Sequence, residues 1–583
     1  MAWYNEAIFY HIYPLGMLDA PKVNDYSEVV HRLRELDKWI GHIKGIGCNA
    51  IYIGPLFKSV GHGYETTDYK TLDNRLGDNE DLKNFVANCH KEGIRVILDG
   101  VFNHTGRDFF AFKDIQANRE NSRYKDWYCN VNFYGNNEYN DGFSYDNWGG
   151  YNLMAKLNQR NPEVKNYIAD VIRYWVSEFD IDGLRLDAAD VLDFDFMQML
   201  HGVAAEVKAD FWLMGEVIHG DYSRWVNDHT LHAVTNYTLH KALFSGHNDH
   251  NYFEIAHTVR RLYEMGGNRV DGLGLYNFSD NHDVARIVNK LDNRANYLPV
   301  HILVYTLPGV PSIYYGSEFG IEGEKYRGGP DDAIRPALDF RDLDGVYKDN
   351  AYASVITAIA RVRQEVKSLS YGEYREVSLT NRQFVFSRGG GEDIAIIAVN
   401  NDENPASVWG NNLPDGDYKG LLKGIDMKIV NGGFSVEIPA NSGEIWVKAG
   451  FSDASLSDFE GGKIKDLKEA EVIESKDNQA EEILAAESKD SQAEEILAAE
   501  SKDNQAEESP SASAKYNLSS DYNDINPDKI RQRTDYENMT VNELQVAILE
   551  KMSNNGPVDS QMLRTVKDNV YKDSLINWVK SFR

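Results

Sequence analysis

The sequence has few cysteines, no long apolar run and no recognisable targeting segment. Cys48, Cys89 and Cys129 are the only cysteines among 583 residues, and they have neither metal-ligand spacing nor the even number of a disulfide framework. We therefore expect free thiols in a reducing compartment. No run of about eighteen apolar residues occurs, and the first residues lack the basic-then-apolar pattern of a signal peptide. These absences predict a cytoplasmic protein without a membrane span.

The charge balance lacks any basic excess. The chain has 91 acidic and 61 basic residues, which gives a formal net charge of −30. Nucleic acid is therefore not an expected partner, because binding to phosphates needs clustered positive charge. A neutral polymer such as a glycan is compatible with this balance. The hydrophobic content of 42% is sufficient for a large core.

Short apolar segments alternate with helical spacing through the first part of the chain. Proline at the first turn of the stretch 162–179 is typical of a helix start. Eight strand–helix units predict an α/β fold, a (β/α)8 TIM barrel, over residues 1–370. The expected strands are 8–13, 50–53, 94–99, 181–187, 211–215, 232–235, 273–278 and 311–315.

Two further segments are expected to be ordered beside the barrel strands. Residues 104–157, after the third strand, are rich in Asn, Gly and aromatic residues. An insertion of this length is usually functional, and we predict a small loop subdomain over the barrel mouth. Residues 371–450 show short β runs separated by glycine-rich turns, which predict an antiparallel β-sandwich.

The composition changes again after residue 450. Residues 451–515 contain 18 acidic residues and 7 lysines, and a 13-residue unit begins at Glu474, Glu487 and Glu500. This pattern predicts an acidic low-complexity linker. Residues 516–583 carry a capping-box pattern and helical apolar spacing, which predict a small helical module. The segment 451–583 is a candidate for self-association or for binding a protein partner.

Polar residues gather where the expected barrel strands end. In a parallel barrel, these carboxyl ends meet at one mouth. Each residue alone has an ordinary structural explanation, and Arg185 with Asp187 reads first as a structural ion pair. Jointly, several carboxylates in a partly buried mouth are costly, which favours a functional site. The candidates are Tyr64, Asp99, His104, Arg185, Asp187, Glu216, His282 and Asp283.

These motifs together resemble the α-amylase superfamily of glycoside hydrolases. The stretch Met154-Ala-Lys-Leu-Asn158 is similar to the form found in its neopullulanase, cyclomaltodextrinase and maltogenic amylase group. The four barrel motifs, in the order of the superfamily, are Asp99-Gly-Val-Phe-Asn-His104, Gly183-Leu-Arg-Leu-Asp187, Gly215-Glu216-Val217 and Phe278-Ser-Asp-Asn-His-Asp283.

The resemblance implies a role for each candidate. Asp187 would be the nucleophile, Glu216 the general acid/base and Asp283 the stabiliser of the transition state. Arg185 would keep Asp187 ionised. The implied substrate contacts are hydrogen bonds from His104 and His282, stacking by Tyr64 and support by Asp99. Two carboxyl groups in these roles fit retaining glycoside hydrolysis, and we predict a separation of about 5 Å between them.

Several positions depart from the superfamily pattern. Asp190 and Val191 stand where many α-amylases have Lys-His, one of which helps to bind calcium. Asn103 matches a calcium ligand, but its partner set is incomplete. We therefore expect no required cofactor and disfavour calcium near Asn103. Ile218 and Glu65 also differ from the common residues, and the N-terminal β domain of the group has no counterpart before the first strand.

The resulting functional prediction is a retaining α-glucan hydrolase. It would cleave α-1,4-glucosidic bonds in maltodextrins, with cyclodextrins and pullulan as further candidate substrates. A 4-α-glucanotransferase or an α-glucosidase on the same fold remains open, because both share the covalent intermediate. A non-catalytic glycan-binding subunit is disfavoured, since all three carboxylates are present. The expected partners are α-glucan oligosaccharides.

Overall fold

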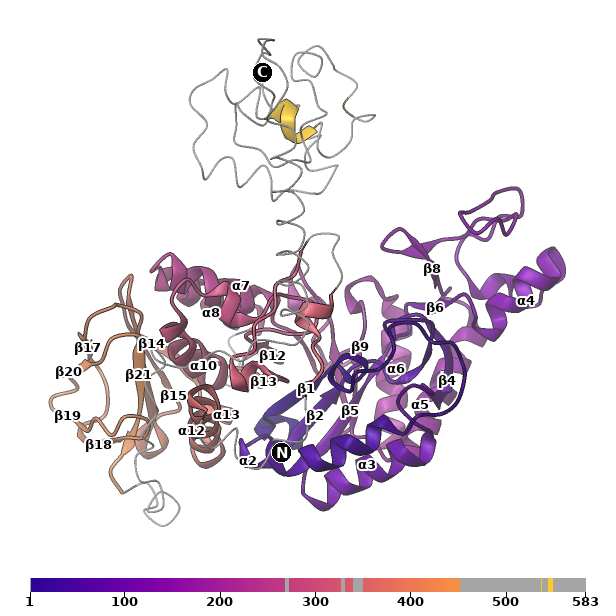
Figure 1. Cartoon of the computed structure of the whole chain (residues 1–583). Coiled ribbons are helices and arrows are strands. Elements are labelled where there is room, and N and C mark those ends of the chain that lie inside the picture. The colour runs from indigo at the N-terminus through magenta and orange to yellow at the C-terminus, as the bar shows by residue number, and fades with distance from the viewer. Residues whose placement is uncertain are drawn as a thin grey trace, which may run out of the picture. The chain divides into compact units, whose positions relative to one another are not determined.

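A computed structural model describes residues 2–267, 272–326, 331–338 and 350–450, together with residue 536 and residues 544–548. Residues 1–485 and 486–583 form separate compact units, and the barrel and the C-terminal sheet both belong to the first. Figure 1 shows the barrel at the centre of this unit, with the inserted subdomain and the C-terminal sheet on different sides of it.

Eight strands close into a parallel barrel, as the sequence predicts. Around the barrel the order is β1, β2, β5, β9, β10, β11, β12 and β13, and β13 pairs with β1. The strands are β1 (Phe9–Ile12), β2 (Ala50–Ile53), β5 (Arg95–Gly100), β9 (Gly183–Leu186), β10 (Trp212–Gly215), β11 (Ala233–Thr235), β12 (Leu275–Phe278) and β13 (Val310–Tyr314).

Helices follow most strands and cover the barrel. Side-chain caps explain several starts: Asn161 accepts a hydrogen bond from the backbone of Glu163, and Asp193 caps the next helix in the same way. The helices are α2 (Ile40–Gly45), α3 (Asn79–Lys91), α5 (Pro162–Phe179), α6 (Phe194–Val207), α7 (Tyr237–Asn248), α8 (Tyr252–Met265), α10 (Tyr297–Thr306) and α12 (Ala351–Glu365).

The sequence pattern does not predict α7 and α10. Every residue of α10 is buried, because the barrel lies on one side and the C-terminal sheet on the other. A helix that is apolar on all faces shows no 3.6-residue periodicity, so its sequence does not reveal it as a helix.

Large side chains fill the inside of the barrel below the mouth. Phe9 and Trp212 stack with ring centroids 5.0 Å apart, and Tyr276 meets Phe9 edge to face at 5.5 Å. Ile97 and Met214 complete this inner cluster. The barrel interior is therefore a packed floor beneath the polar mouth, not a pore.

The predicted subdomain after the third barrel strand is present. It contains a three-stranded sheet of order β6-β8-β7 and one helix. Arg107 forms an ion pair with Asp141 at 2.6 Å inside it, and aromatic rings pack around Phe112. The elements are β6 (His104–Gly106), α4 (Phe110–Asn118), β7 (Asn147–Trp148) and β8 (Tyr151–Lys156). Figure 1 shows it projecting from the barrel.

The C-terminal strands form two antiparallel sheets, in agreement with the predicted sandwich. Val408 and Ile438 from the smaller sheet pack on Ile396 and Trp446 from the larger one. The larger sheet has the order β14 (Tyr374–Leu379), β15 (Gln383–Arg388), β16 (Ala395–Asn400), β21 (Ser442–Lys448), β18 (Gly416–Gly420) and β19 (Met427–Ile429). The smaller sheet pairs β17 (Ala406–Gly410) with β20 (Phe434–Ile438).

Much of the chain after residue 450 lies outside the described residues. This includes the whole predicted linker 451–515. Within the predicted helical module 516–583, the described stretch 544–548 is helical, and its Leu544 and Ile548 are buried. Among the residues that the structure describes, no helix has the length and apolar character needed to cross a bilayer. Cys48, Cys89 and Cys129 are free thiols.

Candidate active site

The predicted site residues meet at one end of the barrel. Asp99 lies in β5 and Arg185 in β9, while Asp187 and Glu216 follow the ends of β9 and β10. His282 and Asp283 follow β12. All barrel strands are parallel, so these positions belong to the same carboxyl-terminal face. Tyr64 reaches this face from the loop between β3 (Phe57–Ser59) and β4 (Thr66–Leu72), and His104 from the start of β6.

Arg185 is the centre of the cluster. Its Nη1 contacts Asp99 Oδ1 and Asp187 Oδ1, both at 2.9 Å, and its Nη2 contacts Glu216 Oε2 at 2.8 Å. The guanidinium is 3% exposed. A planar guanidinium has five donors in a fixed arrangement, so it can fix three carboxyl groups at once. The predicted Arg185–Asp187 ion pair is therefore one part of a larger buried network.

The pKa of Asp187 differs from the simple expectation. Burial is the largest cause and raises this pKa well above its usual value; Arg185 lowers it, and the charge of Glu216 raises it again. Burial and the charge of Glu216 therefore oppose the ionising effect of Arg185 on Asp187, and the role that the resemblance gives to Arg185 stays a prediction. One guanidinium faces three carboxyl groups, and a proton held among them relieves their mutual repulsion.

Asp283 has the opposite environment. Burial would raise its pKa, but His282 and Arg335 outweigh this effect and hold the pKa well below its usual value. The carboxylate contacts His282 Nε2 at 3.0 Å and Arg335 Nη2 at 3.0 Å. The mouth thus contains one carboxyl group that favours a proton and one that favours ionisation, an arrangement typical of acid–base sites.

Tyr64 and the two histidines line the same mouth. The Tyr64 hydroxyl donates to Asp99 Oδ2 at 3.3 Å and also contacts His282 Nε2. His104 Nε2 donates to the backbone carbonyl of Tyr64 at 3.1 Å. Burial lowers the pKa of His104 to about 3, so this ring is neutral and keeps the tautomer with Nε2 protonated. All eight predicted residues therefore lie in one connected site.

Arg335 belongs to the site but was missed by sequence reasoning. It follows the short 3-10 helix η9 (Asp332–Ile334), and its Nε donates to the backbone carbonyl of His282 at 2.9 Å. Its guanidinium lies 4.6 Å from the centre of the Tyr13 ring. The rule used on the sequence considered polar residues where strands end. Arg335 is far along the chain from any strand end, so no pattern marked it.

The inserted subdomain adds an aromatic ring beside the mouth. Trp148, in β7, lies parallel to His104 with ring centroids 6.5 Å apart and an interplanar angle of 7°. Its side chain is half-buried, and Gly149 and Gly150 follow it with positive φ. These glycines allow the tight turn into β8. The subdomain therefore contributes directly to the edge of the site.

Asn103, the position that matches a calcium ligand of the superfamily, lies next to His104 in the site. Its Oδ1 is buried without a hydrogen-bond partner, and its Nδ2 lies 3.2 Å from His104 Nδ1. In the described part of the chain, the one cluster of three His, Cys, Asp or Glu ligands is elsewhere, at His31, Asp78 and Asp81. Calcium prefers six to eight oxygen ligands with several carboxylates. The expectation that calcium is not required near Asn103 stays a prediction.

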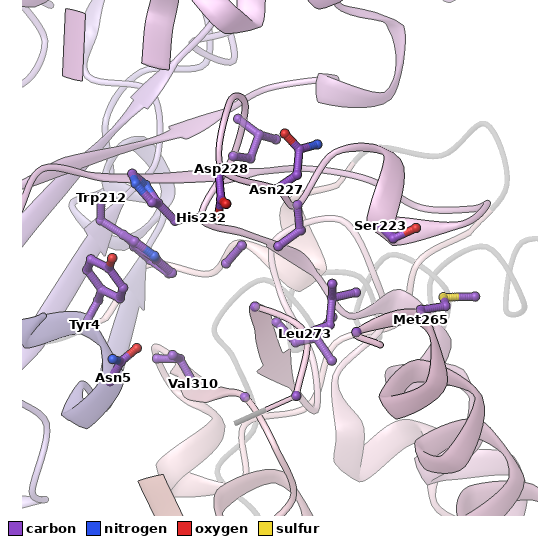
Figure 2. A pocket seen from close by; sticks show the side chains of 18 of the residues that line it. Tyr4, Asn5, Trp212, Ser223, Asn227, Asp228, His232, Met265, Leu273 and Val310 are labelled. Atoms are coloured by element: carbon purple, nitrogen blue, oxygen red, sulfur yellow. The ribbon is translucent and has the colours of Figure 1, made fainter. Parts of the chain in front are cut away.

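A separate cavity opens at the opposite end of the barrel. It has a volume of about 460 Å³ and is lined by residues where β10, β11, β12 and β13 begin. Figure 2 shows Tyr4, Trp212 and His232 on one side of it. The cavity also borders Gly272, next to residues outside the described part. The catalytic candidates do not line it, because they lie where the strands end.

Comparison with known proteins identifies relatives of this chain that cover much of the barrel. The family model for the catalytic domain of alpha amylase matches residues 33–354. A cyclomaltodextrinase from Bacillus sp is 31% identical over 426 residues, which cover 69% of this chain and 74% of the relative. Neopullulanase 2 from Thermoactinomyces vulgaris is 31% identical over 64% of this chain and 65% of its own. An intracellular maltogenic amylase from Bacillus subtilis is 33% identical over a match that covers 53% of this chain and 52% of the relative.

Solved structures agree with these sequence relatives. A cyclomaltodextrinase structure superposes with a TM-score of 0.67 at 26% identity, covering 76% of this chain and 78% of the other. The structure of a debranching enzyme from Nostoc punctiforme has a TM-score of 0.65 at 25% identity. The match covers 76% of this chain and 99% of that enzyme. The residues matched by the family model include the barrel strands from β2 to β13 and the carboxylate cluster. The chain therefore belongs to the alpha-amylase family of glycoside hydrolases.

Proposed function

We propose that this glycoside hydrolase cleaves α-1,4-glucosidic bonds of maltodextrins with retention of anomeric configuration. The observation that carries the proposal is the buried cluster in which Arg185 holds both Asp187 and Glu216. Retaining hydrolysis needs two carboxyl groups on either side of the scissile bond, one ionised and one protonated. The names of the relatives, cyclomaltodextrinase, maltogenic amylase and neopullulanase, support α-glucans as the substrate class.

In the first step, Asp187 attacks the anomeric carbon while Glu216 protonates the departing glycosidic oxygen. The bond between sugar and leaving group breaks as the glycosyl ester on Asp187 forms. In the second step, Glu216 removes a proton from water while the water oxygen attacks the anomeric carbon. The ester bond to Asp187 breaks, and Asp187 is released as a carboxylate. The first step requires an ionised Asp187 and a protonated Glu216. A separation of about 5 Å between Asp187 and Glu216 remains a prediction.

The other mouth residues support this reaction through the bound sugar. Asp283, whose pKa is held low, stays ionised and stabilises positive charge that develops at the anomeric carbon. Tyr64 offers a ring face, and His104 and His282 offer nitrogen atoms for sugar hydroxyl groups. Asp99 is already bound by Arg185 and Tyr52, which gives it a supporting role. Because the ligand set at Asn103 is poor, we propose that no metal is required.

A substrate panel tests the proposal. Maltotriose, β-cyclodextrin, pullulan, panose and starch are incubated with the wild-type chain and with the variants Asp187→Asn and Glu216→Gln. We expect glucose and maltose from maltotriose, with the newly formed anomer observed first as α by NMR. Unchanged activity in Asp187→Asn, or a first-formed β anomer, would contradict the proposal. Oligosaccharides longer than maltotriose in high yield would instead identify a glucanotransferase.

A further inference from the structure

The proposed acid/base, Glu216, has a hydrogen-bond partner at the start of the helix that follows β11, a strand that supplies none of the three proposed catalytic carboxylates. Tyr237 is the first residue of α7, directly after β11 and Asn236. Its hydroxyl donates to Glu216 Oε1 at 3.4 Å and accepts a hydrogen bond from Asn281 Nδ2 at 3.1 Å. Asn281 Oδ1 in turn accepts from the backbone N–H of Asp283 at 2.8 Å. A continuous chain therefore joins Glu216 to the loop of Asp283.

The two oxygens of Glu216 are held differently. Oε2 receives Arg185 Nη2 at 2.8 Å and the backbone N–H of Ala188 at 3.0 Å. Ala188 has a left-handed backbone with φ of 46°, a rare conformation for a residue other than glycine. Within the described residues, Oε1 has a single hydrogen-bond donor, which is Tyr237. The orientation of Oε1, the oxygen left to face substrate, thus depends on this tyrosine.

The position of Tyr237 is itself well fixed. Asn236 caps α7 by accepting a hydrogen bond from the backbone N–H of Leu239, and it donates to Asn277 Oδ1 at 2.8 Å in β12. The Tyr237 ring packs edge to face on Phe278 with centroids 5.0 Å apart. Burial raises the pKa of Tyr237 well above its usual value, so the hydroxyl remains a donor through the working pH range.

We propose that Tyr237 is a positioning residue for the general acid/base. Its hydroxyl directs Glu216 Oε1 toward the glycosidic oxygen, and its hydrogen bond strengthens as Glu216 gives up its proton. A donor to a carboxylate favours the ionised form, so Tyr237 helps proton release to the leaving group. This inference rests on the proposed function, because it assigns a partner to the acid/base of that reaction.

The variant Tyr237→Phe removes one oxygen and keeps the ring on Phe278. We expect kcat/KM for maltotriose to fall about tenfold, a fraction of what a general acid contributes. Loss of the donor makes Glu216 hold its proton more tightly, so the basic limb of the kcat/KM profile moves up by about half to one pH unit. The charged groups that face Glu216 from neighbouring elements are unchanged in this variant: Arg185, Asp187, Asp190 and Asp283.

Leaving-group dependence separates positioning from a general structural effect. With 2,4-dinitrophenyl α-maltoside, departure of the leaving group needs no proton, so we expect the defect of Tyr237→Phe to shrink below about twofold. Tyr222→Phe is the matched control, because the Tyr222 hydroxyl bonds Thr238 Oγ1 at 2.9 Å and does not contact Glu216. The control should keep wild-type values with both substrates.

Equal defects with both substrates, or an unmoved basic limb, would overturn the inference. A defect of the same size in Tyr222→Phe would also overturn it, because the effect would then be a general consequence of disturbing this region. Melting temperatures of the two variants check that both chains fold. Failure of the proposed function would look different, since Glu216→Gln would then keep wild-type hydrolysis.

Discussion

Two buried regions of this protein concentrate charge, and they balance it in opposite ways. At the barrel mouth, the guanidinium of Arg185 faces the carboxyl groups of Asp99, Asp187 and Glu216. Where the barrel meets the C-terminal sheet, Arg363 and Arg388 are buried, and their hydrogen bonds go to backbone carbonyls. One region has excess carboxylate; the other has cations whose partners are uncharged.

The hydrogen-bond partners of the interface arginines are groups that do not titrate. Arg363 Nη1 donates to Tyr305 O and Arg388 Nη1 donates to Thr306 O, both at 2.6 Å, at the C-terminal end of α10. These carbonyls carry the partial negative charge of the helix end. Burial lowers the pKa of both arginines, but carbonyl groups do not titrate. At the mouth, every partner of Arg185 can gain or lose a proton, which is what catalysis requires.

The largest difference between the regions should appear when each loses one of its charged side chains. We expect Asp187→Asn to lower kcat for maltotriose at least about 10⁴-fold, because the nucleophile is lost. The raised pKa of Asp187 means that its ionised form destabilises the folded state as pH rises above the unfolded pKa of about 3.9. Asn cannot ionise, so the variant should be more stable than wild type at pH 7. Circular dichroism melts and initial rates measure both quantities.

Two results for Asp187→Asn would contradict this prediction: a melting temperature at pH 7 below that of the wild type, and a kcat above about 1/100 of the wild-type value. The control variant is Asp190→Asn. The Asp190 carboxyl group lies beside the cluster but contacts neither Arg185 nor, in the proposed mechanism, the anomeric carbon. It should keep most of the activity.

Loss of a cation at the interface should affect stability alone. Arg388→Met leaves the buried carbonyl of Thr306 without its donor, and we expect the free energy of unfolding to fall by about 2–3 kcal/mol. The kcat at 25 °C should stay unchanged, because the site lies at the barrel mouth. Urea unfolding followed by fluorescence is the measurement. Arg382→Met is the control, since Arg382 is 38% exposed and its pair with Asp402 spans 3.6 Å; a surface pair contributes under about 1 kcal/mol.

A smaller effect on stability is expected at Asp283, whose environment within the mouth is opposite to that of Asp187. The pKa of Asp283 is held below its usual value, so this group stabilises the fold above the unfolded pKa of about 3.9, and the stabilisation is lost as pH falls through the folded pKa. We expect Asp283→Asn to lose less stability than wild type between pH 5 and 3, by at least about 1 kcal/mol. Identical acid unfolding curves would show that His282 and Arg335 do not favour the ionised form.

The smallest expected effect is that of metal removal. Arg185 already supplies positive charge to the mouth, and we propose that no metal is required, so EDTA should change kcat/KM by less than about twofold. Dialysis against EDTA followed by activity and melting measurements, with and without added calcium, is the test. A fall that calcium restores would mean that charge at the mouth is balanced by an ion as well as by Arg185.

Local patterns were sufficient for the barrel strands and for the expectation that the eight candidate residues meet at one mouth; their roles stay predictions. Alternating strands and helices predict parallel order, and parallel order brings strand ends together. The same reasoning missed Arg335 and Tyr237. Arg335 lies far along the chain from a strand end, whereas Tyr237 lies two residues after β11 but was not among the polar candidates. Each matters because of what it contacts: Arg335 binds Asp283, and Tyr237 binds Glu216.

The sequence by itself determined the class of fold and the superfamily, and it predicted which carboxylates gather at the barrel mouth, because these depend on residue type and spacing along the chain. Only the tertiary structure decided how Arg185 is shared and which carboxyl group favours a proton. It also decided that α10 is a helix between two layers. The reason is physical: burial and the charges of neighbours from distant segments set these properties, and neither is encoded in any short stretch.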